Sequence, residues 1–261
     1  MAKFCPLFSS SSGNSAFIGG NSGGVLVDIG VSAKKITDAL KENGIEPDEI
    51  KGIFITHEHN DHIKGLSVFL KKYNIPVFAS RDTLSAIEKC CELPSDAKLK
   101  EIDGVAELYD MQILRFPTSH DCVGSSGYKF MLENGPEISV CTDLGIVTDE
   151  VRNAIKGSDL IMLESNHDLQ MLKKGPYPPL LKLRILGDTG HLSNNSCATE
   201  LPFLLNNGTQ RFVLGHLSKE NNLPTIAYST AVTSLADIGA EVESDYILRV
   251  APEEKGEMLY L

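Results

Sequence analysis

The sequence has no long apolar run, no N-terminal apolar segment of signal-peptide length and no paired cysteine motif. No stretch reaches the roughly 18 apolar residues of a membrane-spanning helix. The N-terminus, MAKFCPLFSSSSGNS, has one lysine and no apolar segment of signal-peptide length. None of the six cysteines belongs to a CxxC pair, which in a chain of this size favours free thiols in a reducing compartment. We therefore expect a cytoplasmic protein with no membrane contact.

Basic residues are scarce relative to acidic ones. The chain contains 24 Lys and Arg against 35 Asp and Glu, so its formal net charge is −11. This excess of acid argues against broad, nonspecific binding to nucleic acid or to anionic membranes. It does not exclude an enzyme of nucleic acids with a local basic patch, because bound metal ions can reverse the sign of the charge inside a site.

Internal repeats, linkers and low-complexity segments are also absent, apart from the four serines at 9–12. With 261 residues, of which 42% are hydrophobic and 23% charged, the chain is long enough to bury a sizeable core. We expect residues 1–261 to form one domain that needs neither a disulfide nor a structural metal to fold.

Short β-branched segments alternate with amphipathic segments along the chain. The β-branched segments predict strands at 16–18, 25–28, 52–56, 77–79, 112–116, 127–132, 138–142, 160–164 and 212–215. The amphipathic segments predict helices at 33–43, 63–72, 84–91, 148–156, 193–206 and 223–238. Strands with helices interspersed in both halves predict an α/β (α+β) fold, a sandwich with helices outside two sheets.

The strongest chemical signal is THEHNDH at residues 56–62, directly after an apolar run. His57 and His59 are two positions apart in an extended segment, so they project to the same side. Asp61 and His62 come at the turn into a helix and can face a second point nearby. Imidazole and carboxylate together suit divalent transition metals. The alternative is a solvated polar loop, but three histidines and two acids within six residues are hard to explain in that way.

The pattern HxHxDH after an apolar strand resembles the metallo-β-lactamase fold superfamily, and the other motifs of that superfamily follow in order. Asp28 ends an apolar strand, His120 stands in TSHD, Asp143 in CTDLG and His216 in LGHLS. The resemblance implies a four-layer αββα sandwich, a single hydrolase domain over residues 1–261, with two metal ions at one edge of the sheets.

The resemblance also implies a role for each of these side chains. The implied ligands are, for the first ion, His57, His59 and His120, for the second ion, Asp61, His62 and His216, and for both ions, Asp143. Asp28 would hold the histidine-bearing loop from behind the ligands. The alternative interpretations are turn-forming residues for the two aspartates at 28 and 143, and isolated histidines for positions 120 and 216.

Seven ligands over two ions leave positions open for water and substrate, as a catalytic site requires. Two ions about 3.5–4 Å apart can lower the pKa of a shared water and hold a substrate oxygen. This arrangement suits in-line displacement at phosphorus by a metal-bound hydroxide. The donor types suit zinc or manganese, with iron or nickel as alternatives. No cysteine replaces an implied ligand, which disfavours a class B β-lactamase.

Two later motifs resemble tRNase Z. The apolar strand DLIML is followed by Glu164, and GHLSN contains His191. The resemblance implies that Glu164 orients His191 and that His191 protonates the leaving oxygen, with Asp61 as the third catalytic residue. Alternatively, Glu164 only ends a strand and His191 only precedes a helix. His167 can be a substrate contact or an exposed loop histidine.

Over nearly its whole length the chain resembles the YycJ/WalJ-type group of bacterial exonucleases. The shared segments are SSSGNS near the N-terminus, ESNHD, GHLSN, and GHLS followed by two asparagines. This group is associated with 5′-to-3′ DNA exonuclease activity and with DNA repair. The chain has neither the Gly- and Pro-rich arm of tRNase Z nor room for the inserted domain of the β-CASP nucleases.

Four cations and a tyrosine between Glu164 and His191 are candidates to bind the phosphates and bases of a polyanion. With one serine beyond His191, the candidate substrate-binding residues are Lys173, Lys174, Tyr177, Lys182, Arg184 and Ser193. A solvated loop whose charges aid solubility is the alternative. The segment 9–14 can form a polar loop near the site or a Ser/Gly-rich hairpin turn.

Together, the motifs predict a dinuclear metal-dependent phosphodiesterase whose partner is nucleic acid, DNA in preference to RNA. The specific expectation is a 5′-to-3′ DNA exonuclease linked to DNA repair. One alternative is a small-molecule hydrolase of thioesters, lactones or cyclic phosphodiesters, which would have a single apolar pocket. Another is a noncatalytic metal-binding adaptor, which would have no open coordination position.

Overall fold

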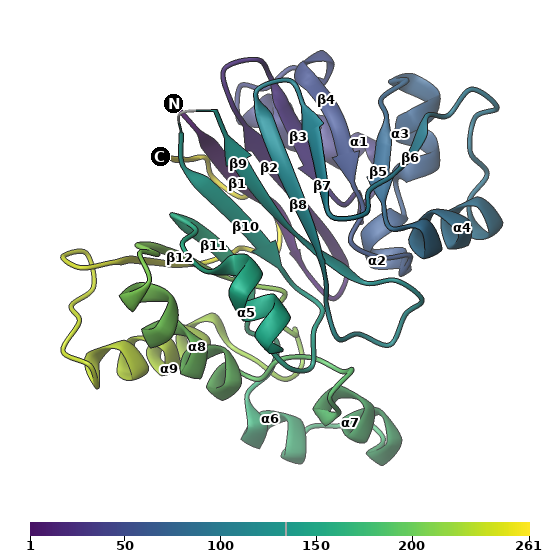
Figure 1. Cartoon of the computed structure of the whole chain (residues 1–261). Helices are drawn as coiled ribbons and strands as arrows, with labels where there is room; N and C mark the ends of the chain where they lie inside the picture. Colours follow the sequence, from purple (N-terminus) through teal and green to yellow (C-terminus); the bar gives the residue numbers. More distant parts are fainter. Residues whose placement is uncertain (134) are drawn as a thin grey trace.

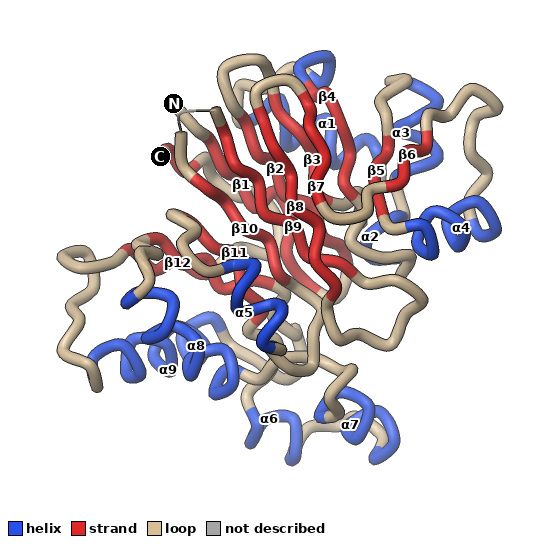
Figure 2. Tube along the Cα trace, in the orientation of Figure 1, coloured by secondary structure: helices blue, strands red, loops and turns tan. Residues whose placement is uncertain are grey.

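The computed structural model describes residues 1–133 and 135–261. In these residues two seven-stranded sheets form the middle of the molecule, and helices cover the outer face of each sheet (Figure 1, Figure 2). This is the αββα sandwich that the sequence predicts. None of the described helices is long and apolar enough to cross a membrane.

The first sheet has the spatial order β14-β1-β2-β3-β4-β5-β6. The strands from β3 to β6 are parallel, whereas β14, β1, β2 and β3 pair antiparallel. Its strands are β1 (Lys3–Ser10), β2 (Gly13–Gly19), β3 (Gly24–Val27), β4 (Ile50–Phe54), β5 (Val77–Ala79), β6 (Leu99–Glu101) and β14 (Leu259–Tyr260). The helices of this half are α1 (Ala33–Glu42), the 3₁₀ turn η1 (Pro47–Glu49), α2 (Asn60–Ile63), α3 (Leu66–Lys72) and α4 (Arg81–Cys90).

The second sheet has the order β13-β12-β11-β10-β9-β8-β7. The strands from β10 to β13 are parallel, and the remaining pairs are antiparallel. Its strands are β7 (Val105–Leu108), β8 (Met111–Pro117), β9 (Ser126–Leu132), β10 (Glu137–Cys141), β11 (Leu160–Glu164), β12 (Arg211–Gly215) and β13 (Ile247–Val250). The helices of this half are α5 (Asp149–Ile155), α6 (Leu169–Lys174), α7 (Pro179–Leu186), α8 (Asn194–Asn206) and α9 (Pro224–Ala236).

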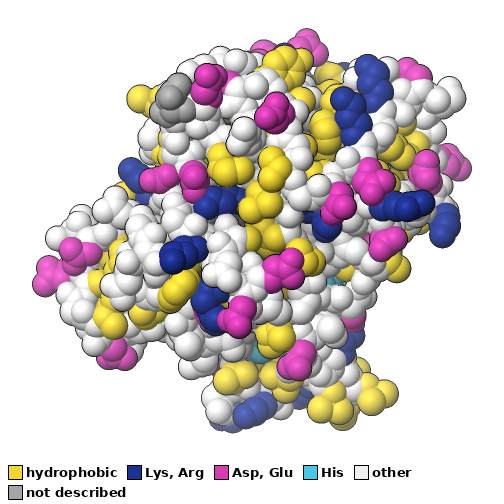
Figure 3. Space-filling model, in the orientation of Figure 1, with side chains coloured by type: hydrophobic (Ala, Val, Ile, Leu, Met, Phe, Trp, Pro, Cys, Tyr) yellow, Lys and Arg dark blue, Asp and Glu magenta, His cyan; other side chains and the backbone are white. Residues whose placement is uncertain are grey.

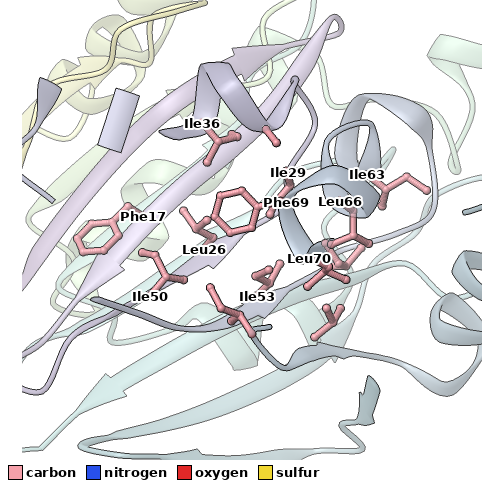
Figure 4. Packing of buried hydrophobic residues seen from close by; sticks show 14 of the residues in the cluster. Phe17, Leu26, Ile29, Ile36, Ile50, Ile53, Ile63, Leu66, Phe69 and Leu70 are labelled. Atoms are coloured by element: carbon pink, nitrogen blue, oxygen red, sulfur yellow. The ribbon is translucent and has the colours of Figure 1, made fainter. Parts of the chain in front are cut away.

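Three apolar layers hold these four layers of structure together. Between the sheets, Phe54 stacks on Phe78 at 4.8 Å and meets Phe130 edge-on at 5.3 Å. Outside the first sheet, Leu26 and Phe69 belong to the cluster that packs the sheet against α1 and α3 (Figure 4). A third cluster packs the second sheet against α5, α8 and α9. Because both faces of the central strands are buried, these strands read as continuous apolar runs in the sequence.

The structure differs from the sequence-based expectation mainly in short elements. The helix expected at 63–72 begins three residues later, as α3, and a separate short helix α2 precedes it. The two helices are separated at Gly65, where an added Cβ would lie 2.1 Å from the Val31 carbonyl oxygen. Helices α6 and α7 were not expected, because prolines and glycines interrupt the apolar periodicity of that segment. Strands β6 and β7 are short and largely exposed, so they lack a buried run that would identify them.

Candidate metal centre

The carboxyl ends of the parallel strands meet at one edge of the sandwich, and the candidate residues lie there. Asp28 follows β3 and His57 follows β4 in the first sheet. In the second sheet Asp143 follows β10, Glu164 ends β11 and His216 follows β12. Neighbouring parallel strands point the same way, so residues far apart in the chain become neighbours at this edge.

Three of these residues leave their strands through left-handed backbone. The φ angles are 62° at Asp28, 58° at Asp143 and 55° at His216. Such conformations cost about 1–3 kcal/mol each for residues other than glycine and persist where the surroundings enforce them. Here the amide of His216 donates to the Ser9 hydroxyl at 2.7 Å, and the amide of Asp28 donates to the Phe54 carbonyl at 2.9 Å. The backbone is thus turned at the points where a side chain must face the centre.

The three histidines expected around the first ion form a compact group. His57 Nε2 lies 3.0 Å from His59 Nδ1, and His120 Nε2 lies 3.3 Å from the same His59 atom. Tetrahedral zinc with bonds of about 2.0–2.1 Å holds its nitrogen ligands about 3.3–3.4 Å apart. The spacing of these nitrogens therefore fits one shared ion.

The residues expected around the second ion form an adjoining group. Asp61 Oδ2 lies 3.5 Å from His62 Nε2 and 3.8 Å from His216 Nε2. Asp143 reaches both groups, with Oδ2 at 3.4 Å from His62 Nε2 and Oδ1 at 3.9 Å from His120 Nε2. Among the described residues, Asp143 Oδ2 and His216 Nε2 are buried without a hydrogen-bond partner. Two neighbouring sets of donors, some of them buried and unpaired, could therefore bind metal.

In four of the histidines, Nδ1 contacts an oxygen atom of a neighbouring residue. His62 Nδ1 lies 2.7 Å from Asp28 Oδ2, and His216 Nδ1 lies 2.6 Å from Glu164 Oε1. The remaining contacts are His57 Nδ1 to Thr56 Oγ1 at 3.0 Å and His120 Nδ1 to the Gly190 carbonyl at 3.1 Å. Holding one nitrogen orients the ring and frees the other for a metal, as in carboxylate–histidine–metal sites.

Asp28 connects two of these histidines. It accepts from the amide and the hydroxyl of Thr56, both at 2.8 Å, and from His62. We expect Asp28→Asn to weaken metal binding about 10–100-fold, because His62 loses its ionised partner while asparagine still tolerates the left-handed backbone. Competition with a chromophoric chelator measures this, with the exposed Asp38→Asn on α1 as the control. Unchanged affinity in Asp28→Asn would contradict this role.

Negative charge at the edge of the sheets dominates the local electrostatics. Burial alone would lower the pKa of His216, but the charge of Asp143, the nearby Asp61 carboxylate and the hydrogen bond to Glu164 raise it to about 10. Burial likewise opposes charge on His62, yet the charges of Asp143 and Asp28 raise its pKa well above the usual value. A site that stabilises protons on two imidazoles also attracts cations, and metal binding there would release those protons.

His57 has the opposite shift. Burial and the charges of His62, His120 and His59 hold its pKa well below the usual value. It is therefore a neutral imidazole, which is the form that binds a metal.

Glu164 and His191 form the pair that the sequence predicts. His191 Nδ1 lies 2.9 Å from Glu164 Oε1, and Glu164 Oε2 accepts from the amides of Leu144 and Leu192 at 3.0 Å each. Burial opposes charge on His191, but the charge of Glu164 and its hydrogen bond raise the pKa of His191. Glu164 also holds His216, so one buried carboxylate orients a candidate ligand and the candidate acid together.

The candidate substrate-binding residues divide into two kinds. Lys173 and Lys174 are exposed in the last turn of α6. In contrast, Lys182 Nζ donates to the carbonyls of Lys173 and Gly175 at 2.8 and 2.7 Å. Arg184 forms a bidentate ion pair with Asp121, directly after His120. This pair ties α7 to the loop that carries a candidate metal ligand.

The other two residues of that set lie differently. Tyr177 is half-buried between α6 and α7, whereas Ser193 is buried and its hydroxyl accepts from the Ser196 amide at the start of α8. Apolar side chains are exposed on α7, with Leu180 81% and Leu183 66% accessible. Hydrophobic side chains accordingly gather at the lower end of the molecule in Figure 3.

The first hairpin combines the two alternatives that the sequence left open for segment 9–14, and only the contacts of Asn14 were not foreseen. The segment 9–14 contains the tight turn between β1 and β2, and it also lies at the site. Asn14 Nδ2 lies 3.1 Å from His62 Nε2 and 3.4 Å from Asp61 Oδ2. The only sequence signal was the run of small polar residues, which turns share.

His167 is buried, with 1% of its surface accessible, so its interpretation as an exposed loop histidine is wrong. Neither ring nitrogen has a hydrogen-bond partner within the described residues. Burial lowers the pKa of His167 to about 4, so the ring is neutral.

Two sheets between helices, with clustered histidines and aspartates at their common edge, define a metallo-hydrolase. The sequence profile of the Metallo-beta-lactamase superfamily matches residues 10–163, and the chain belongs to this superfamily. The exodeoxyribonuclease WalJ of Streptococcus pneumoniae is 38% identical over 247 residues, which cover 92% of this chain and 91% of that protein. The exodeoxyribonuclease YycJ of Bacillus anthracis is 35% identical over 238 residues, 90% of each chain.

A solved structure confirms the fold. The metallo-β-lactamase fold protein YhfI of Bacillus subtilis superimposes with a TM-score of 0.72 over 99% of this chain and 98% of that chain, at 14% sequence identity. At this identity the likeness shows a shared architecture only.

Proposed function

We propose that this chain is a metal-dependent exodeoxyribonuclease that degrades DNA in the 5′-to-3′ direction with two divalent metal ions, zinc or manganese. The observation that carries the proposal is its identity of 35–38% with two proteins named exodeoxyribonucleases, over nine-tenths of all three chains. The geometry supports it, because six of the seven implied ligands form two adjoining groups of three, and the seventh, Asp143, forms a further group with His57 and His62; within each group the donor atoms are within 4.8 Å of one another. A function in DNA repair in the cytoplasm belongs to the same proposal.

The residues divide the chemistry between binding and proton transfer. Two divalent ions, when bound, would neutralise charge on the phosphate and activate water. Asp143 lies between the two donor groups and would hold both ions at a constant separation. Glu164 holds the proton of His191 on Nδ1, which leaves Nε2 to donate a proton to the leaving oxygen. His191 is 18% exposed and Glu164 is fully buried, so only the histidine of this pair can reach substrate.

Removal and replacement of metal tests the proposal directly. The protein is treated with a chelator and then given Mn²⁺ or Zn²⁺, together with DNA labelled at the 5′ or the 3′ end and with RNA. We expect no cleavage without metal and, with metal, early release of the 5′ label while the 3′ label stays on shortening strands. Asp61→Ala, which removes a candidate ligand, should be inactive on every substrate.

Two results would contradict the proposal. Full activity in Asp61→Ala would show that cleavage does not use this centre. Absence of any nucleic-acid cleavage by protein that holds two metal ions would favour a small-molecule hydrolase instead.

A further inference from the structure

A pocket of about 310 Å³ lies next to the hairpin that contacts the metal centre, and no candidate metal ligand or candidate substrate-binding residue described above lines it. It opens where the tip of the β1–β2 hairpin meets the start of α1, the end of α2 and the loop after β12. Its polar lining consists of three lysines, three serines and two glutamates: Lys35, Lys64, Lys219, Ser10, Ser12, Ser32, Glu253 and Glu254. Ammonium groups and hydroxyls can all donate hydrogen bonds to an anion.

The pocket is joined to the metal centre through the chain. Lys64 comes two residues after His62, and Lys219 comes three residues after His216. The hairpin that forms one wall also carries Asn14, which contacts two candidate ligands. An anion in this pocket would therefore lie close to the group that reacts.

Close packing keeps the hairpin in this place. A Cβ added to Gly13 would lie 2.3 Å from Val31 Cγ1, and one added to Gly30 would lie 1.7 Å from the Asp61 carbonyl oxygen. No larger residue fits at either glycine without moving the backbone of the site. The pocket wall thus packs closely against the segments around Val31 and Asp61.

The ion pairs around the pocket leave its lysines available to an incoming anion. Among the described residues, Lys64 forms no ion pair, whereas Lys35 pairs with Glu254 at 2.5 Å and Lys219 pairs with Glu253. These two pairs are about half exposed, with side-chain accessibilities of 45–51%, so each contributes little stability. An incoming phosphate can replace either glutamate. Ser32 caps α1, so the positive end of that helix also faces the pocket.

We propose that this pocket binds a phosphate group of the DNA strand next to the phosphate under attack. The proposal rests on the proposed nuclease function and deepens it, because it assigns a second anchoring point on the substrate. Lysine suits this task as a compact charge that meets phosphate oxygens from any direction. Two contacts on successive phosphates would hold the strand in register while one bond is broken.

Single substitutions test the pocket through binding. In Lys64→Gln and Lys219→Gln, we expect KM for a DNA strand to rise about five- to tenfold at low salt, with the effect on KM rather than on kcat. The slope of log KM against log salt should fall by about 1 in each variant. Lys41→Gln, on an exposed lysine of α1 outside the pocket, is the matched control and should behave as the unchanged protein does.

Substitutions of the two glutamates give a result of opposite sign. Glu253→Gln and Glu254→Gln release Lys219 and Lys35 from their pairs, so KM should fall about two- to fivefold. A loss of fold cannot produce tighter binding, so this arm separates the proposal from general damage to the protein. Inorganic phosphate should inhibit DNA cleavage competitively, and more weakly in Lys64→Gln.

The failures are distinguishable. If the protein degrades DNA but the lysine and glutamate variants keep its KM and salt slope, the pocket proposal is wrong and the proposed function stands. If Lys64→Gln weakens only inorganic phosphate binding, the pocket serves free phosphate and the proposal is also overturned. If metal-loaded protein cleaves no nucleic acid, both are wrong.

Discussion

Asp143→Asn is expected to lower the rate of DNA cleavage by at least about 10³-fold, which corresponds to about 4 kcal/mol of lost transition-state stabilisation. The carboxylate of Asp143 faces His62 through Oδ2 and His120 through Oδ1, at 3.4 and 3.9 Å. No other described side chain has its two oxygens directed at histidines of the two separate donor groups. Loss of the Asp143 charge should therefore weaken the binding of both metal ions.

Asparagine is the informative replacement at this position. Asp143 has φ 58°, and asparagine is one of few residues that accept this backbone conformation at small cost. Volume is also kept, so the fold should remain intact. Bound metal measured by mass spectrometry should fall, and the melting temperature without metal should not.

Asp38→Asn serves as the control, because Asp38 is exposed on α1. It loses the same charge far from the centre and should keep the full rate and metal content. If Asp143→Asn retained two ions and a rate within tenfold of the unchanged protein, the bridging assignment would be wrong.

His191→Ala is expected to lower the rate about 10²–10⁴-fold, as is usual when a general acid is removed. His191 is held by Glu164, which is buried and receives two further amides, so its ring has one orientation. The loss should depend on the leaving group. In a nitrophenyl phosphodiester, the nitrophenolate group leaves without needing a proton. The His191→Ala variant should therefore cleave this substrate at nearly the normal rate.

The pH dependence gives a second readout of the same role. A general acid acts in its protonated form, so the rate should fall as pH rises through the pKa of His191. Because Glu164 raises that pKa, the fall should lie above the ordinary histidine range. His191→Ala should lose this limb of the profile. A variant that keeps the limb, or that loses equal activity on both substrates, would assign His191 a structural role.

Several elements were predictable because their signal is local. The central strands carry continuous apolar runs, and HxHxDH places two pairs of donors within six residues. Two other elements, β1 and α7, were harder to predict from the sequence. Strand β1 contains a proline and ends in two serines, which interrupt its apolar run and weaken the strand pattern. Helix α7 has exposed leucines on its outer side, which removes the usual contrast between a polar and an apolar face.

By itself, the sequence determined the alternation of strands and helices and the dense donor motif at residues 57–62, because these signals are local, whereas the four-layer sandwich and the distant ligands His120, Asp143 and His216 came from the resemblance to a family. Only the tertiary structure decided how those ligands are held. Glu164 forms hydrogen bonds with two histidines, and Ser9 accepts a hydrogen bond from the amide of His216, 207 positions away. Arg184 forms an ion pair with Asp121. Such contacts join segments that are remote in the chain, and nothing in the local pattern of either segment records its partner.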